Sequence, residues 1–157
     1  MPVANINYFA YFELEGGYIN NRIYTISVEN CDDIKFIYNE KKIISFAIKV
    51  NQVGYSPKVH EHYGYIGRWM GTYGKLSLNE YVGKPFKLMQ NDKEVYSGII
   101  EWRLQDDPIY FTSGIPTDLN REETLLMDIS SYKGTGENYY FYVEGIGISL
   151  NFSISYK

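Results

Sequence analysis

The sequence predicts an all-β protein, an antiparallel sandwich of about ten short strands. Turn signals rich in glycine, asparagine, aspartate and proline recur about every ten to fifteen residues along the chain. The segments between them alternate apolar with polar residues or are rich in β-branched and aromatic ones, and none sustains the 3.6-residue period of an amphipathic helix. We therefore expect less than about a tenth of the residues to be helical.

The first 44 residues predict strands ahead of the main body of the protein. Strands are expected at residues 22–28 and 34–38, after an apolar and aromatic run at residues 6–12. These strands are either added to the same sandwich or form a short preceding β unit. Because no linker rich in Pro, Gly or Ser precedes Ser45, we expect a single domain over residues 1–157, in which residues 1–44 supply extra strands and residues 45–157 the core.

The remaining strands follow in short succession. A hairpin is expected around the tight turn at residues 91–93, whereas residues 105–120 form the longest irregular segment and contain two prolines. Cys31, the single cysteine, cannot form a disulfide within the chain, and we expect its thiol to be buried. The expected strands are residues 46–50, 63–70, 85–90, 95–104, 125–129, 139–143 and 148–155.

A structural corner is expected where the strand at residues 46–50 ends. Asn51 and Gln52 place two amides where the strand would enter the core, and each unpaired amide would cost about 1–3 kcal/mol. We expect both amides to bond backbone groups of a neighbouring loop, with Tyr55 packed beneath them. Gly54 permits a crowded or left-handed backbone, and Pro57 ends the strand pairing.

This corner carries a family resemblance. Val50-Asn51-Gln52-Val53-Gly54-Tyr55-Ser56-Pro57 resembles the opening of the immunoglobulin-like module that precedes the catalytic barrel in glycoside hydrolase family 9 enzymes. Further segments are similar to elements of that module and occur in its usual order, so the resemblance covers roughly residues 45–154. These segments are residues 63–71, 95–98, 127–133, 139–143 and 145–154.

The resemblance implies an immunoglobulin-like β-sandwich and a function. The chain would be a non-catalytic accessory module of a polysaccharide-degrading, cellulase-like enzyme. It would pack on and support the catalytic domain of that parent enzyme, which is its expected partner. The alternative is an independent carbohydrate-binding module for β-glucan-type plant polysaccharides. A third class is a free-standing adhesion or structural sandwich.

No catalytic pair is expected. Glycoside hydrolysis needs two carboxylates that flank one glycosidic bond. The family carries its pair in the barrel, and no segment like its Asp-Ala-Gly-Asp occurs here. Asp106 and Asp107 are adjacent, so in a strand they would point to opposite faces, and they are better interpreted as turn residues. The expectation is that this chain is not an enzyme.

Metals and other cofactors are not expected either. His60 and His62 could form half of a zinc site, but no further histidine exists and Cys31 would have to join them. Asp106, Asp107 and Asp118 could ligate calcium from one long loop, although their spacing is unlike an EF-hand. A solvated loop is the preferred interpretation, and calcium stays an unsupported alternative.

Charge and hydropathy exclude other classes of partner. The net charge of −4 and the pI near 5.2 argue against a nucleic-acid surface, which would be basic. No run of 18 apolar residues occurs, so no membrane span is expected. Residues 1–5 lack the basic and apolar regions of a signal peptide. The chain is therefore either cytoplasmic or a piece of a secreted protein; the resemblance favours an extracellular piece of a larger bacterial protein.

Sugar binding is the remaining chemistry that the sequence supports, because aromatic rings cover the flat apolar faces of pyranoses. Trp69 and Trp102 are the only tryptophans, and each precedes a loop that contains Tyr73 or Tyr110. If the strand runs through residues 63–70, Tyr63, Tyr65 and Trp69 share one of its faces. That face either meets a glycan or a catalytic domain or fills the core between sheets; we expect at least one tryptophan in the core.

Overall fold

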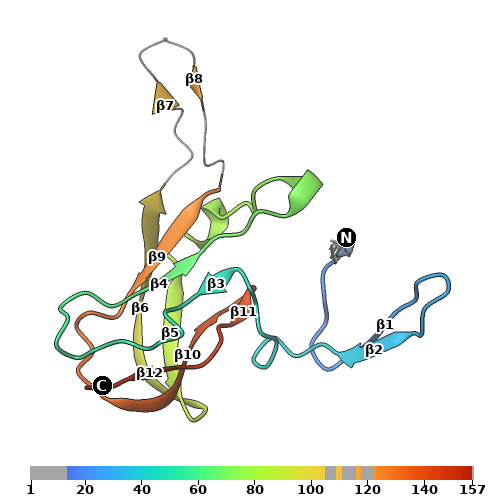
Figure 1. Cartoon of the computed structure of the whole chain (residues 1–157). Coiled ribbons are helices and arrows are strands. Elements are labelled where there is room, and N and C mark those ends of the chain that lie inside the picture. The colour runs from blue at the N-terminus through green and yellow to red at the C-terminus, as the bar shows by residue number, and fades with distance from the viewer. Residues whose placement is uncertain (1–13, 105–108, 111–115, 118–121, 157) are drawn as a thin grey trace, which may run out of the picture. The chain divides into compact units, whose positions relative to one another are not determined.

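The computed structural model describes residues 14–104, 109–110, 116–117 and 122–156 (Figure 1). The described residues form β-strands and two short 3-10 turns and contain no α-helix, which confirms the all-β prediction. No helix in this part of the chain is long and apolar enough to cross a membrane. The chain divides into two compact units, Met1–Asn39 and Glu40–Lys157, and the expectation of a single domain stays a prediction.

The first unit contains one antiparallel hairpin, β1 (Ile23–Ile26) and β2 (Ile34–Ile37). Tyr24 lies opposite Phe36, and their rings stack at 5.8 Å between centroids. Tyr18 stacks on Tyr38 at 5.0 Å, which extends this aromatic cluster. The expectation of a buried thiol was wrong: Cys31 is exposed because it lies in the turn between the strands, where its N–H donates to the Val28 carbonyl.

The second unit is organised around one antiparallel sheet (Figure 1). Its strand order is β11-β10-β5-β6-β9-β4-β3. Strand β12 also pairs with β10, at residues of β10 that precede those paired with β11. The strand bounds are β3 (Ile48–Lys49), β4 (Tyr63–Ile66), β5 (Pro85–Gln90), β6 (Lys93–Leu104), β9 (Thr124–Asp128), β10 (Gly136–Val143), β11 (Gly147–Ile148) and β12 (Phe152–Ile154).

Shorter elements connect these strands. The 3-10 turns are η1 (Gly71–Tyr73) and η2 (Asn79–Tyr81), and a second small hairpin joins β7 (Ile109–Tyr110) to β8 (Pro116–Thr117). The long strand β6 belongs to both halves of the sheet, since its first part pairs with β5 and its last part with β9. It therefore couples the two halves.

The sheet nearly closes on itself through two parallel bridges. Ile44, ahead of β3, bridges Ile148 in β11, and the Ser45 N–H donates to the Ile148 carbonyl at 2.8 Å. Tyr55, after β3, bridges Ile154 in β12, and its N–H donates to the Ser153 carbonyl at 2.8 Å. The segments on either side of β3 thus pair with part of the opposite end of the sheet, which leaves less of its edges unpaired.

The core lies inside this nearly closed sheet and follows the strand alternation. In β4, Gly64 and Ile66 are buried, whereas Tyr63 and Tyr65 are half-buried on the outer face. Gly64 is required by close packing, because a Cβ there would lie 2.7 Å from the Phe141 ring. The largest fully buried side chains are Tyr139, Phe86, Phe141, Ile66, Leu78, Leu88, Ile100, Leu125, Met127 and Ile129.

Candidate functional site

The structural corner after β3 is held by Tyr55. Its ring is buried and packs edge-on against Phe152 and His62, with centroid distances of 5.1 and 5.4 Å. Its hydroxyl donates to the Tyr63 carbonyl at 2.5 Å and accepts the Asn51 N–H at 3.2 Å. Burial raises the pKa of the Tyr55 phenol. Tyr55 therefore connects the corner to β4 through its hydroxyl.

The two amides of the corner behave differently from the expectation. Asn51 Oδ1 accepts the Val53 N–H at 3.1 Å, within its own turn, and both Asn51 and Gln52 are exposed. The predicted bonds to a neighbouring loop were therefore wrong, because the turn bends the amides outward and local Asx bonding satisfies Asn51. Gly54 has a φ of 101°, and a Cβ there would lie 2.6 Å from Ser153 Oγ and 2.9 Å from the Ser153 carbonyl oxygen.

A hollow of about 530 Å³ lies between this corner and the outer face of β4. Three tyrosines line it, namely Tyr55, Tyr63 and Tyr65, together with Val50 and Val59. Its polar lining includes Lys49, Asn51, Ser56, Glu61 and His62. The hollow thus combines aromatic and aliphatic walls with a few polar groups, which is the general composition of small-molecule sites.

Tyr63 and Tyr65 form the β4 side of the hollow. They are two residues apart in β4, so both side chains stand on its outer face. Their ring centroids are 6.4 Å apart, and the ring planes are inclined by 63°. The pKa of Tyr63 is raised by desolvation first and then by the nearby charges of Glu61 and Asp128. The rings form an angled pair and do not make a flat platform.

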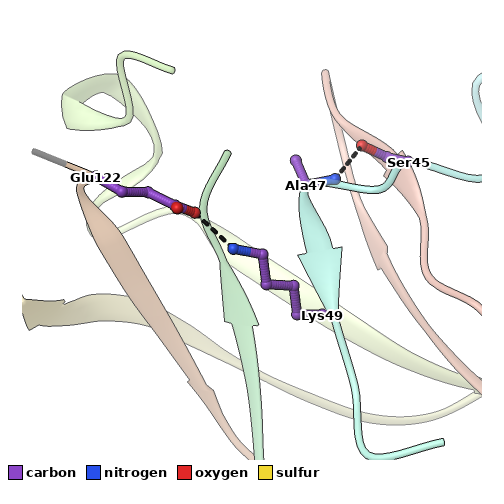
Figure 2. Close-up of polar contacts among 4 residues, drawn as sticks. All are labelled: Ser45, Ala47, Lys49 and Glu122. Carbon is purple, nitrogen blue, oxygen red and sulfur yellow. Dashed lines mark hydrogen bonds and ion pairs between the residues drawn. The ribbon is translucent and has the colours of Figure 1, made fainter. Parts of the chain in front are cut away.

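Lys49 lies in β3 at the register position opposite Tyr65. Its Nζ reaches across β4 to Glu122 Oε1, 2.5 Å away, two residues ahead of β9 (Figure 2). Ahead of the strand, Ser45 Oγ accepts the Ala47 N–H at 3.3 Å, which orders the entry to β3 (Figure 2). The charge of Lys49 is therefore compensated by Glu122, and Glu61 is the one carboxylate among the described residues that line the hollow.

The next residue, Glu123, ties a loop to the sheet. Its carboxylate is buried and accepts from Lys75 Nζ at 3.0 Å and from the Leu78 N–H at 3.1 Å. A Cβ on Gly67 would lie 2.7 Å from Glu122 Oε1 and 2.9 Å from the Glu123 carbonyl oxygen. Because Gly67 has no side chain, the segment that contains both glutamates can lie against the end of β4.

His62 lies in the wall of the hollow, where its backbone and its ring both bond to other protein groups. Its backbone N–H donates to Ser130 Oγ, and its Nε2 lies 2.9 Å from the Ser56 carbonyl oxygen. Since a carbonyl only accepts, Nε2 carries the proton, and Nδ1 is buried without a hydrogen-bond partner in the described part of the chain. His60 is exposed and His62 buried, so the two imidazoles are not presented together, and no group of three metal-binding side chains occurs among the described residues.

Trp69 lies outside the strand that carries Tyr63 and Tyr65. The expected strand over residues 63–70 ends at Ile66, and Trp69 lies beyond it in a loop, where it bridges Lys75. The positive φ values of Gly71 and Gly74 turn this loop around η1. The expected strand bound at residue 70 was therefore wrong, whereas the expected partial exposure of Tyr63, Tyr65 and Trp69 agrees with the structure, and their common face stays a prediction.

The loop aromatics Phe46, Trp69 and Tyr73 are exposed by 65%, 43% and 59%. They come from two segments that the Gly67 N–H to Ala47 carbonyl bond joins at 2.9 Å. The Arg68 guanidinium lies 5.9 Å from the centre of the Phe46 ring, a cation–π arrangement. These three side chains are therefore exposed aromatics in neighbouring segments, and none of them is among the residues that line the hollow.

The other predicted aromatic residues lie elsewhere. Trp102 is half-buried and packs against the core, on the opposite side of β6 from the exposed Glu101 and Arg103. Tyr110 lies in β7, and its side chain falls outside the described residues. The calcium alternative at Asp106, Asp107 and Asp118 also lies outside the described residues.

Sequence reasoning missed several residues of the hollow and its surroundings. Val59, Glu61 and His62 follow the corner in an irregular loop, where no periodicity indicates which side chains turn inward. The partnership of Lys49 with Glu122 joins positions 73 residues apart, which no local pattern predicts. The adjacent Glu122-Glu123 pair before a predicted strand was the available signal for a carboxylate anchor.

Comparison with known proteins gives few matches. No protein-family model matches the sequence, and no curated protein matches it. Among solved structures, the chain is similar to a metagenome-derived glycoside hydrolase family 9 endoglucanase, with 21% sequence identity, a TM-score of 0.48 and 69% of this chain covered. The match spans 18% of the length of that endoglucanase chain.

Proposed function

We propose that the chain is a non-catalytic, immunoglobulin-like accessory module of a polysaccharide-degrading, cellulase-like enzyme, and that it packs on and supports a catalytic domain. The observation that carries this proposal is the exposed surface of the loop aromatics, Phe46, Trp69 and Tyr73. Aromatic side chains are enriched in the buried centres of protein interfaces. A catalytic domain that covered this surface would bury apolar area that the isolated unit leaves in water.

The sequence motif supports the same proposal because its residues have structural roles in the unit. Gly54, Gly64, Gly98 and Gly147 all lie where an added Cβ would come within 2.6–2.7 Å of a neighbouring atom. These close approaches occur at the corner, in two strands and in the closing hairpin. Together with the motif order, they support an immunoglobulin-like arrangement of the nearly closed sheet.

The non-catalytic part of the proposal is supported by the composition of the hollow. Glu61 is its one carboxylate among the described residues, whereas glycoside hydrolysis uses a pair. We expect the purified chain to release no reducing sugar from soluble β-glucans. Hydrolysis that is abolished by Glu61→Gln would contradict the accessory role. We further propose that the parent protein is bacterial and secreted.

Co-elution tests the docking role. The chain is mixed with the catalytic barrel of a family 9 endoglucanase produced without its own module, and the mixture is analysed by size-exclusion chromatography. We expect a complex with the wild type, a weaker one with Trp69→Ala or Tyr73→Ala, and an unchanged one with the control Tyr156→Ala, whose ring is 68% exposed. Separate elution of wild-type chain and barrel would count against docking.

The alternative function is an independent module that binds β-glucan-type polysaccharides. The tyrosines that line the hollow favour it, because aromatic walls with polar neighbours suit pyranose rings. Affinity electrophoresis in cellulose derivatives, mixed β-glucan, xyloglucan and mannan separates the two functions. Strong retardation by one polysaccharide, without complex formation with a barrel, would favour the alternative.

A further inference from the structure

We infer that the hollow beside β4 is a subsite for one pyranose ring of a neutral, soluble oligosaccharide. Its walls include Tyr63, Tyr65 and Val59, which match the apolar faces of a sugar ring, and the exposed Asn51 and Glu61 offer partners for the hydroxyl groups. The loop aromatics that carry the proposed docking role take no part in it. The same chain can therefore hold a glycan while another surface is covered.

The geometry of the tyrosine pair sets the size of the ligand. The planes of Tyr63 and Tyr65 are inclined by 63°, with their centroids 6.4 Å apart. Coplanar rings can follow several sugar units along a flat crystalline chain, whereas an inclined pair offers one ring face and one ring edge. A single pyranose fits this corner, and a crystalline cellulose surface does not.

The charges around the hollow set the class of sugar. Lys49 Nζ is held by Glu122 at 2.5 Å, so its positive charge is compensated. Glu61, exposed at the rim, is an acceptor for sugar hydroxyls. A uronic acid would bring a second negative charge close to Glu61, which is unfavourable. The subsite is therefore selective for neutral sugars over acidic ones.

The choice of a β-linked glucose oligomer as the probe rests on the proposed function. Cellotetraose is titrated into the 15N-labelled chain, and the backbone amide signals are followed by NMR. We expect a Kd of about 0.1–1 mM, since a single ring is held. The largest shifts should fall on residues 49–51 and 59–65. Tetragalacturonate and microcrystalline cellulose should not bind.

Matched variants separate ring stacking from general damage. Tyr65→Ala should weaken cellotetraose binding about tenfold through loss of one wall, whereas Tyr65→Phe, which keeps the ring, should bind like the wild type. Tyr73→Ala, which alters an exposed ring outside the hollow, is the control and should not change the Kd. If Tyr65→Ala fails to fold, the shift map of the wild type still decides the location.

The inference is overturned if cellotetraose does not bind, if the shifts fall outside the hollow, or if tetragalacturonate binds equally well. None of these outcomes bears on co-elution with the barrel, which depends on Trp69 and Tyr73. Failure of the subsite and failure of the docking role are therefore distinguishable.

Discussion

At the scale of single residues, Gly54 and Tyr55 fix the corner that the sequence motif marks. Gly54 combines a φ of 101° with a close approach to the Ser153 backbone, and the next residue donates its N–H to the Ser153 carbonyl. An added methyl group would push β12 away at the bridge that closes the sheet. The Tyr55 hydroxyl links the corner to β4, because it donates to the Tyr63 carbonyl.

Gly54→Ala and Gly83→Ala together test this role. Gly83 has a φ of 81° and nothing within 4 Å of an added Cβ, so its substitution costs only the backbone strain of about 1–3 kcal/mol. Gly54→Ala adds the clash with Ser153, and we expect at least about 1 kcal/mol of extra destabilisation. Urea unfolding of both variants measures the difference. Equal losses would show that the corner does not depend on close approach.

Alkaline pH should destabilise the protein through Tyr139, which is buried, and Tyr140, which is half-buried. Burial raises the pKa of Tyr139, and burial followed by the hydrogen bond to Asp92 raises the pKa of Tyr140 to about 12. An unfolded tyrosine titrates near pH 10, so above that pH the unfolded state loses protons first. The contribution of Tyr140 is complete below about pH 10 and is lost as pH rises toward 12.

The measurement is the free energy of unfolding in urea between pH 9 and about 12, the range set by the ordinary and raised tyrosine pKa values. We expect a steady decline for the wild type and a shallower decline for Tyr140→Phe, which removes one titrating group. A flat profile in the wild type would contradict the raised pKa values.

At the scale of elements, Glu123 anchors the loop between β4 and η2 to the start of β9. It accepts from Lys75 and from the Leu78 N–H, and Leu78 is fully buried. Glu122 makes a comparable ion pair with Lys49, but the Lys49 side chain is 50% exposed. Neighbouring glutamates therefore differ in how much the fold depends on them.

We expect Glu123→Ala to destabilise the unit by about 1–3 kcal/mol, because it leaves the buried Leu78 N–H without its acceptor. Glu122→Ala should cost less than about 1 kcal/mol, as is usual for pairs near the surface. Thermal unfolding gives both values, and hydrogen exchange at the Leu78 amide should accelerate only in Glu123→Ala. Similar exchange in the two variants would refute the anchor.

The sequence predicts elements well where the signal is local. The hairpin of β5 and β6 was expected around residues 91–93, and Asn91 and Asp92 adopt positive φ values of 48° and 64° at that turn. The predicted strand extended to residue 70, whereas β4 ends at Ile66. The residues after Ile66 continue the sequence pattern of a strand, but the positive φ values of Gly71 and Gly74 turn the chain into a loop. Local propensity does not contain that tertiary constraint.

Closure of the sheet and the hollow depended on contacts between distant residues. The bridges from Ile44 to Ile148 and from Tyr55 to Ile154 join segments that no local pattern pairs. Tyr63 and Tyr65 were selected correctly as residues of one face, but Glu61 and Val59 enter the hollow from an irregular loop. Trp102 was grouped with the sugar-binding residues, yet its place in β6 turns it toward the core.

At the scale of the whole molecule, the two tryptophans are natural reporters of docking. Trp69 belongs to the loop aromatics and is 43% exposed, whereas Trp102 packs against the core. A catalytic domain that covers the loop aromatics must change the surroundings of Trp69 and leave those of Trp102 unchanged. The two residues therefore provide a signal and an internal control in one chain.

The most direct test labels this chain alone with 5-fluorotryptophan and records 19F NMR spectra before and after adding an unlabelled family 9 catalytic barrel. Trp102→Phe assigns the two signals. The account predicts that the Trp69 signal shifts and loses its exposure to solvent on addition of the barrel, while the Trp102 signal stays in place. A Trp69 signal that remains unchanged at saturating barrel concentration would contradict the accessory-module function.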